Sequence, residues 1–141
     1  MPNPRPIEQM RRTAPPFLKL LGGEIAAADP ESGTCRIDFN VGREFCHSGD
    51  VVQGGFPTAM LDAAMSHAVF AQDNSVIALS SLEISTRYLE VTRAGPVQAH
   101  GRIVRVSYKT AFLEGELRSP EGLLLATAHT VAKLGRRPAE G

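Results

Sequence analysis

One acidic side chain stands alone in a long, weakly polar stretch of the sequence. Asp62 lies within residues 54–70, a segment otherwise made of glycine, proline, apolar residues and a few uncharged polar ones. Burial of an unpaired carboxylate costs on the order of several kcal/mol, so a fold keeps one in such surroundings mainly for a reason. That reason is often catalysis. We therefore interpret Asp62 as a candidate catalytic group; the alternative is a structural carboxylate paired with a basic or hydroxyl neighbour.

A pair of glycines at the start of the same segment is the second candidate. Gly54 and Gly55 come eight and seven residues before Asp62, and the following Pro57 is compatible with the first turn of a helix. The first amides of a helix have no intrahelical partner, and they stabilise an oxygen that gains negative charge. Glycine lets a ligand approach that backbone closely. We expect residues 54–72 to form a helix with this property.

The composition bounds the class of protein. The 141 residues, 43% of them hydrophobic, fit one globular domain. Fifteen basic and fifteen acidic residues cancel, so we expect no nucleic-acid or membrane partner. Cys35 and Cys46 lack the spacing of a zinc site or a disulfide framework. The five prolines of residues 1–17 and the lack of long apolar runs lead us to expect neither a secretory signal nor a membrane span. We expect a cytoplasmic protein with no metal.

Hydrophobic patterning predicts one long helix and about six strands. Residues 1–16 are proline-rich and predict an arm or short helix, with two helical turns over 7–13; residues 17–28 and 34–41 predict a hairpin with a turn at 29–33. Residues 42–53 are expected to be irregular. Further strands are predicted near 81–89, 97–106, 108–117 and 123–134. The expected fold class is α+β, with the main domain over 17–135 and a tail at 136–141.

The segment 47–55 followed by Asp62 resembles the signature of the hotdog-fold acyl-CoA thioesterases, in the PaaI-like (phenylacetate-type) branch of the 4-hydroxybenzoyl-CoA thioesterase superfamily. In that branch a polar residue, often Asn, precedes a Gly-Gly pair that caps the central helix, and an acidic residue follows within the helix. The order of elements over 17–133 and the strand 81–89 are also similar. The resemblance implies one central helix wrapped by a curved antiparallel sheet, no cofactor, and homodimers or homotetramers (dimers of dimers) with composite sites between subunits.

The resemblance also implies a reaction, the hydrolysis of an acyl-CoA or aryl-acyl-CoA thioester to the free acid and CoA. The Gly54 amide would polarise the carbonyl, with Gly55 as its close neighbour. Asp62 would activate water as a general base or attack the carbonyl itself, and the sequence does not separate these two roles. A hotdog hydratase or dehydratase and a non-catalytic acyl-CoA binding or sensing module are the alternatives.

Several further positions match or depart from the family pattern. His47 stands where the family commonly carries Asn or Gln; it could hold the lytic water or the thioester sulfur, protonate the leaving thiolate, or simply be a loop histidine. Gln53 replaces a histidine that is frequent before the Gly-Gly pair. Ser81 matches a strand hydroxyl that lies close to the acid in relatives, and Ser80 takes its place if the strand register shifts by one.

Basic residues in the last third of the chain could bind the phosphates of CoA, although each is also an ordinary surface charge. They are Arg102, Arg105 and Lys109, with Arg136 and Arg137 in the tail.

The spacing between the glycines and the acid adds a geometric constraint. Eight residues of helix separate Gly54 from Asp62 by roughly 12 Å, which is too far for both to act on one carbonyl group. We therefore expect a two-fold dimer in which antiparallel helices bring each Asp62 near the Gly54 of the other chain.

Overall fold

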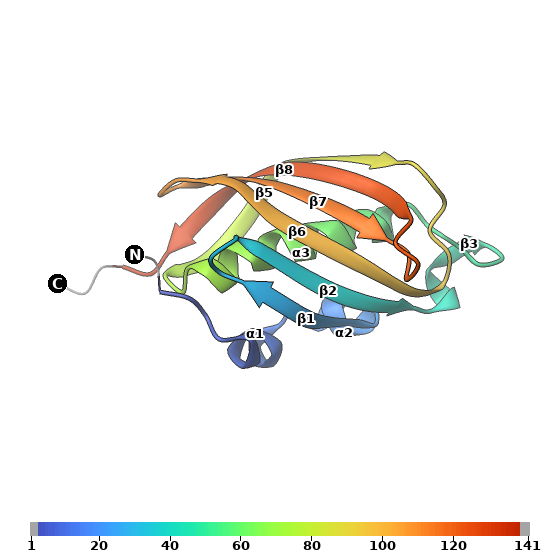
Figure 1. The fold of residues 1–141 in the computed structure, drawn as a ribbon, viewed down its shortest axis with the longest axis horizontal. Helices are drawn as coiled ribbons and strands as arrows, with labels where there is room; N and C mark the ends of the chain where they lie inside the picture. Colours follow the sequence, from blue (N-terminus) through green and yellow to red (C-terminus); the bar gives the residue numbers. More distant parts are fainter. Residues whose placement is uncertain (1–2, 139–141) are drawn as a thin grey trace.

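A long helix lies inside a curved antiparallel sheet in the computed structural model, which describes residues 3–138 (Figure 1). Within these residues the sheet has six strands in the order β1-β2-β6-β7-β8-β5, and a separate short hairpin pairs β3 with β4. None of the helices in this part of the chain has the length and apolarity to span a membrane. The elements are α1 (Ile7–Thr13), α2 (Pro16–Leu20), β1 (Gly23–Asp29), β2 (Thr34–Val41), η1 (Arg43–Phe45), β3 (Cys46–Ser48), β4 (Val51–Val52), α3 (Gly55–Gln72), β5 (Val76–Tyr88), β6 (Gly95–Val106), β7 (Thr110–Arg118) and β8 (Leu124–Arg136).

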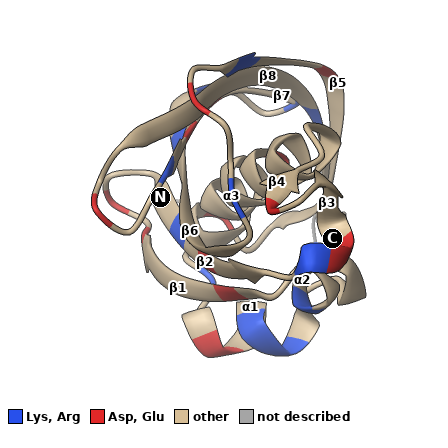
Figure 2. Ribbon diagram, turned by 90° about the vertical axis from the view of Figure 1, so that its right-hand side faces the viewer, with Lys and Arg blue, Asp and Glu red and all other residues tan. Residues whose placement is uncertain are grey.

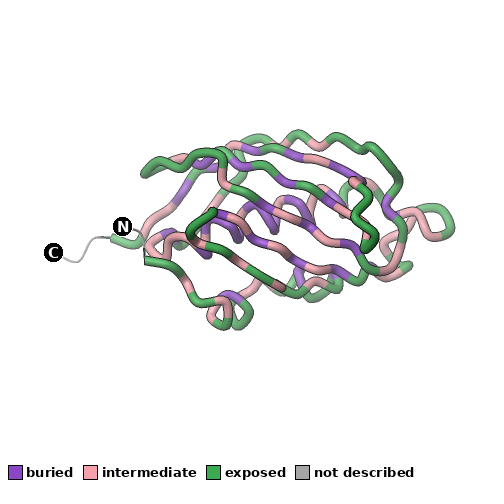
Figure 3. The backbone as a smooth tube through the Cα atoms, in the orientation of Figure 1, coloured by how far each residue is buried: buried purple, intermediate pink, exposed green. Residues whose placement is uncertain are grey.

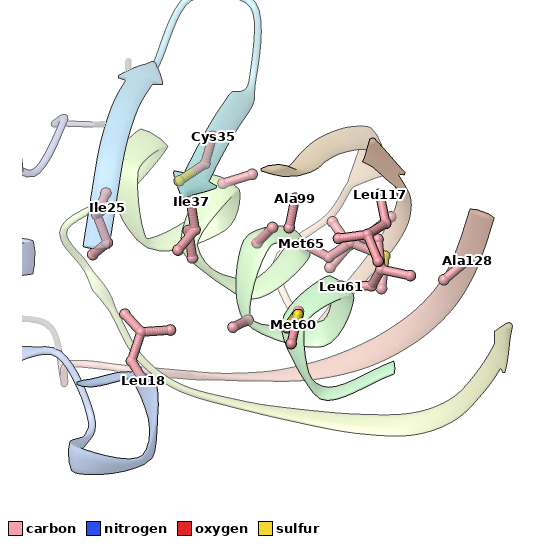
Figure 4. Close-up of a cluster of buried hydrophobic side chains, with 14 of the residues drawn as sticks. Leu18, Ile25, Cys35, Ile37, Met60, Leu61, Met65, Ala99, Leu117 and Ala128 are labelled. Carbon is pink, nitrogen blue, oxygen red and sulfur yellow. The ribbon is translucent and has the colours of Figure 1, made fainter. Parts of the chain in front are cut away.

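The core lies between α3 and the concave face of the sheet. Met60, Leu61 and Met65 of α3 are fully buried, and they pack toward inward-facing residues such as Ile37 and Leu117 (Figure 4). Burial alternates along β2 and β7, as expected for strands that contact the core on one face only (Figure 3). Seen along the helix, the strands curve around α3 (Figure 2). The predicted α+β architecture is confirmed.

The start of the first predicted strand is wrong. Residues 17–20 belong to α2, and β1 begins only at Gly23. The consecutive prolines explain the difference, because Pro15 is the N-cap of α2 and Pro16 its first residue, where proline is favoured. Leu18 is 2% exposed and contributes to the core from this single turn of helix. The apolar residues that suggested a strand are therefore buried by a helix instead.

Other predicted elements agree closely with the structure. The helical turns over 7–13 form α1, and α3 begins after its N-cap residue Gly54 and ends at Gln72. The prediction of an irregular segment over residues 42–53 is wrong in part, because this segment contains the short η1 helix and the β3–β4 hairpin. At the C-terminus, Arg136 pairs with Val76 as the last residue of β8. Residues 1–2 of the predicted arm and 139–141 of the predicted tail lie outside the described residues.

A β-bulge in β5 changes which residues of that strand face the helix. Ser81 pairs with Ala132 and Glu83 with Val131, so Leu82 is an extra residue without a partner across the ladder. Strict alternation predicts Leu82 on the same face as Ile84, and this is wrong, since Leu82 is 65% exposed. The extra residue lets Ser81 share the helix-facing side of the strand with the residues that follow the bulge.

The helix and the sheet approach each other most closely at Gly101 of β6. A Cβ atom at this position would lie 2.1 Å from the carbonyl oxygen of Ala64, a backbone atom that cannot rotate away. Gly115 on the neighbouring strand is less restricted, because its Cβ would lie 3.2 Å from the flexible side chains of Leu61 and Met65 and 3.3 Å from the His100 carbonyl oxygen. Glycine at 101 therefore sets the distance between α3 and the sheet.

This contact gives a stability prediction. Gly101→Ala should lower the free energy of unfolding by about 1–3 kcal/mol or more, because α3 must move away from β6. Gly115→Ala, in which the neighbouring atoms need to move by only a few tenths of an ångström, should cost less. Urea denaturation of both variants and the parent chain measures the difference. Equal stability of the two variants would contradict the close approach at Gly101.

Candidate functional site

Asp62 lies on the β5 side of α3, where its carboxylate meets a hydroxyl group. Ser81 Oγ donates a hydrogen bond to Asp62 Oδ1 over 2.7 Å. Ser81 therefore lies next to the acid, as the resemblance implied, and the alternative Ser80 pairs with Lys133 one position further along the ladder. Asp62 is partly exposed rather than fully buried, which corrects the expectation of a carboxylate enclosed in the core.

A pocket of about 530 Å³ lies beside this carboxylate. Asp62, Ser66 and Phe70 of α3 form one wall, Ile77 and Leu79 of β5 another, and Met10 and Phe17 of the N-terminal helices a third. More of this lining is apolar than polar, and Asp62 is part of it. The pocket can hold an apolar group whose reactive end meets Asp62.

The N-terminal wall of the pocket is attached to the far end of α3 by Arg5. Its backbone N–H donates to the Ala71 carbonyl over 2.9 Å, and its guanidinium donates to the carbonyl oxygens of Phe70, Asn74 and Val76. A cation among the last carbonyls of a helix also complements the helix dipole. Arg5 therefore fixes α1 against α3.

The other candidate group, the start of α3, presents unpaired amides. Within residues 3–138, neither the Gly54 N–H nor the Gly55 N–H donates a hydrogen bond to a loop or to another element. The first N–H groups of a helix also have no acceptor within the helix itself. The Gln53 carbonyl accepts from Phe56 N–H over 3.0 Å, which holds the peptide that carries the Gly54 N–H. Two oriented donors are thus available at the positive end of the helix.

The chain itself does not require glycine at either position. Gly54 has a right-handed helical backbone, and neither glycine has a positive φ. A Cβ on Gly54 would lie 3.4 Å from Tyr88 OH, an ordinary contact, and a Cβ on Gly55 would meet no described atom within 4 Å. Glycine is accepted at the N-cap position of Gly54, but packing requires it neither there nor at Gly55. The open space in front of the two amides suits a ligand.

Three hydroxyl groups beside Gly54 are functional candidates that the sequence did not reveal. Tyr88 OH donates to the Gly54 carbonyl oxygen over 2.5 Å. Thr58 Oγ1 lies 2.8 Å from Tyr88 OH and 2.9 Å from Thr86 Oγ1. The period of two in β5 does predict that Thr86 and Tyr88 share a face, but it does not tell which turn of α3 they contact.

His47 and Gln53 lie near the start of α3 and away from Asp62. His47 is exposed in β3, and its Nδ1 is 2.8 Å from Ser48 Oγ. The β3–β4 hairpin extends beyond the N-terminal end of α3 (Figure 1). Gln53 follows this hairpin with an exposed side chain, and its N–H donates to the Phe45 carbonyl. One chain therefore does not bring His47 to the acid.

The cations predicted to bind CoA phosphates lie elsewhere. Arg102 on the outer face of β6 forms an ion pair with Glu114 of β7. Arg105 and Lys109 are exposed near the β6–β7 turn, at the end of the sheet that is opposite to the β3–β4 hairpin (Figure 1). Within one chain, then, none of the three adjoins Gly54.

His67 is a buried titratable group in the wall of the pocket. It is 6% exposed, and its Nδ1 bonds to the Ala63 carbonyl over 2.7 Å. Burial lowers the pKa of the imidazole below the ordinary value of 6.5; the bond to Ala63 opposes this shift, and the positive charge of Arg5 adds to it. Because a carbonyl oxygen only accepts, the neutral ring carries its proton on Nδ1. His67 thus presents an uncharged wall next to Asp62.

The lowered pKa makes stability depend on pH. Below pH 6.5 the His67 side chain of the unfolded chain is protonated, whereas the folded protein keeps it neutral to a lower pH. The contribution of this residue to the free energy of unfolding is therefore fully present above pH 6.5. Below that pH the free energy of unfolding decreases, by up to about 1.4 kcal/mol per pH unit. His100 is shifted in the same direction, mainly by burial. Urea unfolding near pH 7.5 and 5.5 should show a smaller loss for His67→Gln than for the parent chain. An identical loss in both proteins would exclude His67 as a cause of the pH dependence of stability.

Comparison with known proteins defines the class. The model of the thioesterase superfamily matches residues 49–126, which is more than half of the chain and includes Gly54, Asp62 and Ser81. A search of curated protein sequences found no match. The chain belongs to the thioesterase superfamily, whose reaction is the hydrolysis of a thioester.

Solved structures support the same class. A phenylacetic acid degradation-related protein from Ralstonia eutropha is 30% identical with a TM-score of 0.80, and the match covers 90% of this chain and 98% of that one. A thioesterase from Haemophilus influenzae is 18% identical, with a TM-score of 0.83 and coverage of 95% and 93%. The PaaI protein from the phenylacetic acid degradation operon of Escherichia coli is 17% identical, with a TM-score of 0.80 and 92% of each chain covered. The last two show the fold alone, which is the hotdog fold.

Proposed function

We propose that this protein hydrolyses an acyl-CoA or aryl-acyl-CoA thioester to the free acid and CoA. The observation that carries the proposal is the glycine pair at the start of α3, whose amides are unpaired and whose lack of side chains the fold does not require. When a nucleophile attacks a thioester, negative charge builds on the carbonyl oxygen. In this proposal the Gly54 amide, with Gly55 beside it, stabilises that charge.

Asp62 supplies the second half of the reaction as general base or as nucleophile. Ser81 donates to Oδ1, which leaves Oδ2 free to take a proton from water or to attack the carbonyl carbon. The apolar pocket beside Asp62 receives the acyl group. His47 and Gln53, near the start of α3, are then candidates for holding the lytic water or the thioester sulfur.

The CoA phosphates are assigned to exposed cations. Arg105 and Lys109 make no ion pair within residues 3–138 and can bind an anion, whereas Arg102 is neutralised by Glu114. In one chain these cations are far from Gly54, so a neighbouring subunit supplies either the cations or the rest of the site.

The proposed site requires two chains. Gly54 and Asp62 are separated by eight residues of one continuous helix, or about 12 Å, and a thioester carbonyl is much smaller than this distance. The two edges of the sheet differ in a way that favours one dimer. The β1 edge is covered, since Arg11 Nε donates to the Ile25 carbonyl over 2.9 Å.

The opposite edge, β5, is a longer strand, and Arg5 contacts its backbone at the first residue, Val76. Beyond that residue, Ile77, Leu82 and Tyr88 are exposed along the strand. Pairing of β5 with β5 of a second copy sets two α3 helices side by side and antiparallel. Each Asp62 then faces the Gly54 of the other chain, and the dimer has two equivalent sites.

Asp62→Asn tests the role of the acid. The change is nearly isosteric and keeps an acceptor for Ser81, so the chain should fold normally while kcat falls at least about a hundredfold. Steady-state kinetics on a panel of acyl-CoA thioesters measure the loss, and circular dichroism checks folding. Asp38→Asn, on the outer face of β2, is the matched control and should keep full activity. More than a tenth of the parent turnover in Asp62→Asn would exclude the carboxylate as the catalytic group.

Mixing two inactive variants tests whether the site is shared. Gly54→Val and Asp62→Asn should each be nearly inactive alone, because each removes one half of every site. In a heterodimer one site carries both changes and the other carries neither. Random exchange makes about half of the dimers mixed, each with one intact site, so roughly a quarter of the parent activity should return.

Native mass spectrometry verifies that the subunits exchange. Mixed dimers without recovered turnover would mean that Gly54 and Asp62 act within one chain, or that one of them does not act.

A further inference from the structure

A hydrogen bond from the sheet controls the direction of an amide in the candidate site. Tyr88 OH has a single proton, and the Gly54 carbonyl oxygen that it contacts over 2.5 Å can only accept. The phenol therefore donates to Gly54, and Thr58 Oγ1 lies 2.8 Å from the phenol oxygen. Thr58 Oγ1 donates to Thr86 Oγ1, two residues before Tyr88 on β5, over 2.9 Å.

Because the peptide bond is planar, the contact of Tyr88 with the Gly54 carbonyl oxygen also orients the Gly55 N–H. The carbonyl of Gly54 and the N–H of Gly55 belong to one rigid plane, so a bond that fixes the oxygen also fixes the direction of the N–H. The preceding plane, which carries the Gly54 N–H, is held by the bond from Phe56 N–H to the Gln53 carbonyl. Glycines otherwise adopt many backbone conformations, and helix ends fray.

The same strand holds both halves of the site. Ser81 of β5 orients Asp62, and Tyr88 of β5 orients the peptide between Gly54 and Gly55. Because the bulge at Leu82 lies between them, both side chains face α3. A shift of β5 relative to α3 therefore changes the acid and the amides together.

We propose that Tyr88 is a positioning residue, whose hydroxyl holds the Gly54–Gly55 peptide so that the Gly55 N–H points at the thioester oxygen as a second donor beside the Gly54 N–H. This inference rests on the proposed function, and it adds a residue that acts through the backbone without touching the substrate. Thr58 assists by fixing the phenol. The ring of Tyr88 is 50% exposed, so the bond, rather than burial, gives the side chain its role.

Tyr88→Phe keeps the ring and removes only the donor. It should lower kcat about tenfold to a hundredfold with KM changed by less than about threefold, because a misdirected amide weakens the transition state and not the bound substrate. The sequence contains one other tyrosine, Tyr108, which is 70% exposed and packs against Arg136 far from α3's first turn. Tyr108→Phe is the matched control and should leave kcat unchanged.

A second variant and a second readout keep the test independent of folding and of the reaction. Thr58→Val removes the hydroxyl that contacts the phenol, at similar volume, and should lower kcat less than Tyr88→Phe does. Thr58→Ser keeps a hydroxyl at this position and should have the kcat of the parent chain. Amide NMR should show the Gly55 N–H shifted, and exchanging faster with solvent, in Tyr88→Phe but not in Tyr108→Phe.

Each outcome decides the inference. Unchanged kcat in Tyr88→Phe overturns it, and so does a loss that lies mainly in KM, which would make Tyr88 a substrate-binding residue. If Tyr88→Phe is unstable, Thr58→Val decides: normal melting with lowered kcat supports positioning, and normal kcat overturns it. If the parent chain hydrolyses no thioester while the Gly55 signal still moves, the proposed function fails and the backbone role of Tyr88 stands.

Discussion

The close packing of α3 against the sheet is the constraint on which the rest of the structure depends. Gly101 allows the backbone of the helix to lie almost against β6, and fully buried residues such as Met60 and Met65 fill the concave face around it. A helix held this tightly acts as a rigid rod. Gly54 and Asp62 are therefore fixed at a separation set by helix geometry, and no local adjustment can bring them together. The proposal of a site shared between two chains depends on this rigidity.

Much of the fold follows from sequence patterns, and the exceptions have physical causes. The helix over 54–72 and the strand over 34–41 are correct because long periodic segments bury one face along their whole length. The strand predicted from residue 17 fails because a run of apolar residues fits a helix or a strand, and the prolines before Leu18 decide for a helix. The bulge at Leu82 depends on pairing with β8, which is distant in sequence.

The candidate site shows a similar division. Asp62 and the glycine pair stand out because their residue types are costly where they occur, so chemistry on one helix is visible in the sequence. The contact between Ser81 and Asp62 followed from a family resemblance, and strict alternation would have placed that serine on the face opposite to Ile84. Tyr88 carries no such signal. An aromatic residue in a strand is usual, and its bond to a backbone oxygen of another element emerges only in three dimensions.

The unequal edges of the sheet bear on the solubility of the protein. A sheet with two open edges can add strands at both ends and grow into a fibre. Here Arg11 of α1 covers one carbonyl group of β1, that of Ile25, and in the proposed dimer the two-fold pairing of β5 with itself consumes the other edge. Further growth of that dimer would have to start at β1, where the Arg11 side chain stands in the way of an added strand. In the proposed dimer α1 thus has a second role beside its place in the wall of the pocket, since it hinders fibre growth at the remaining edge.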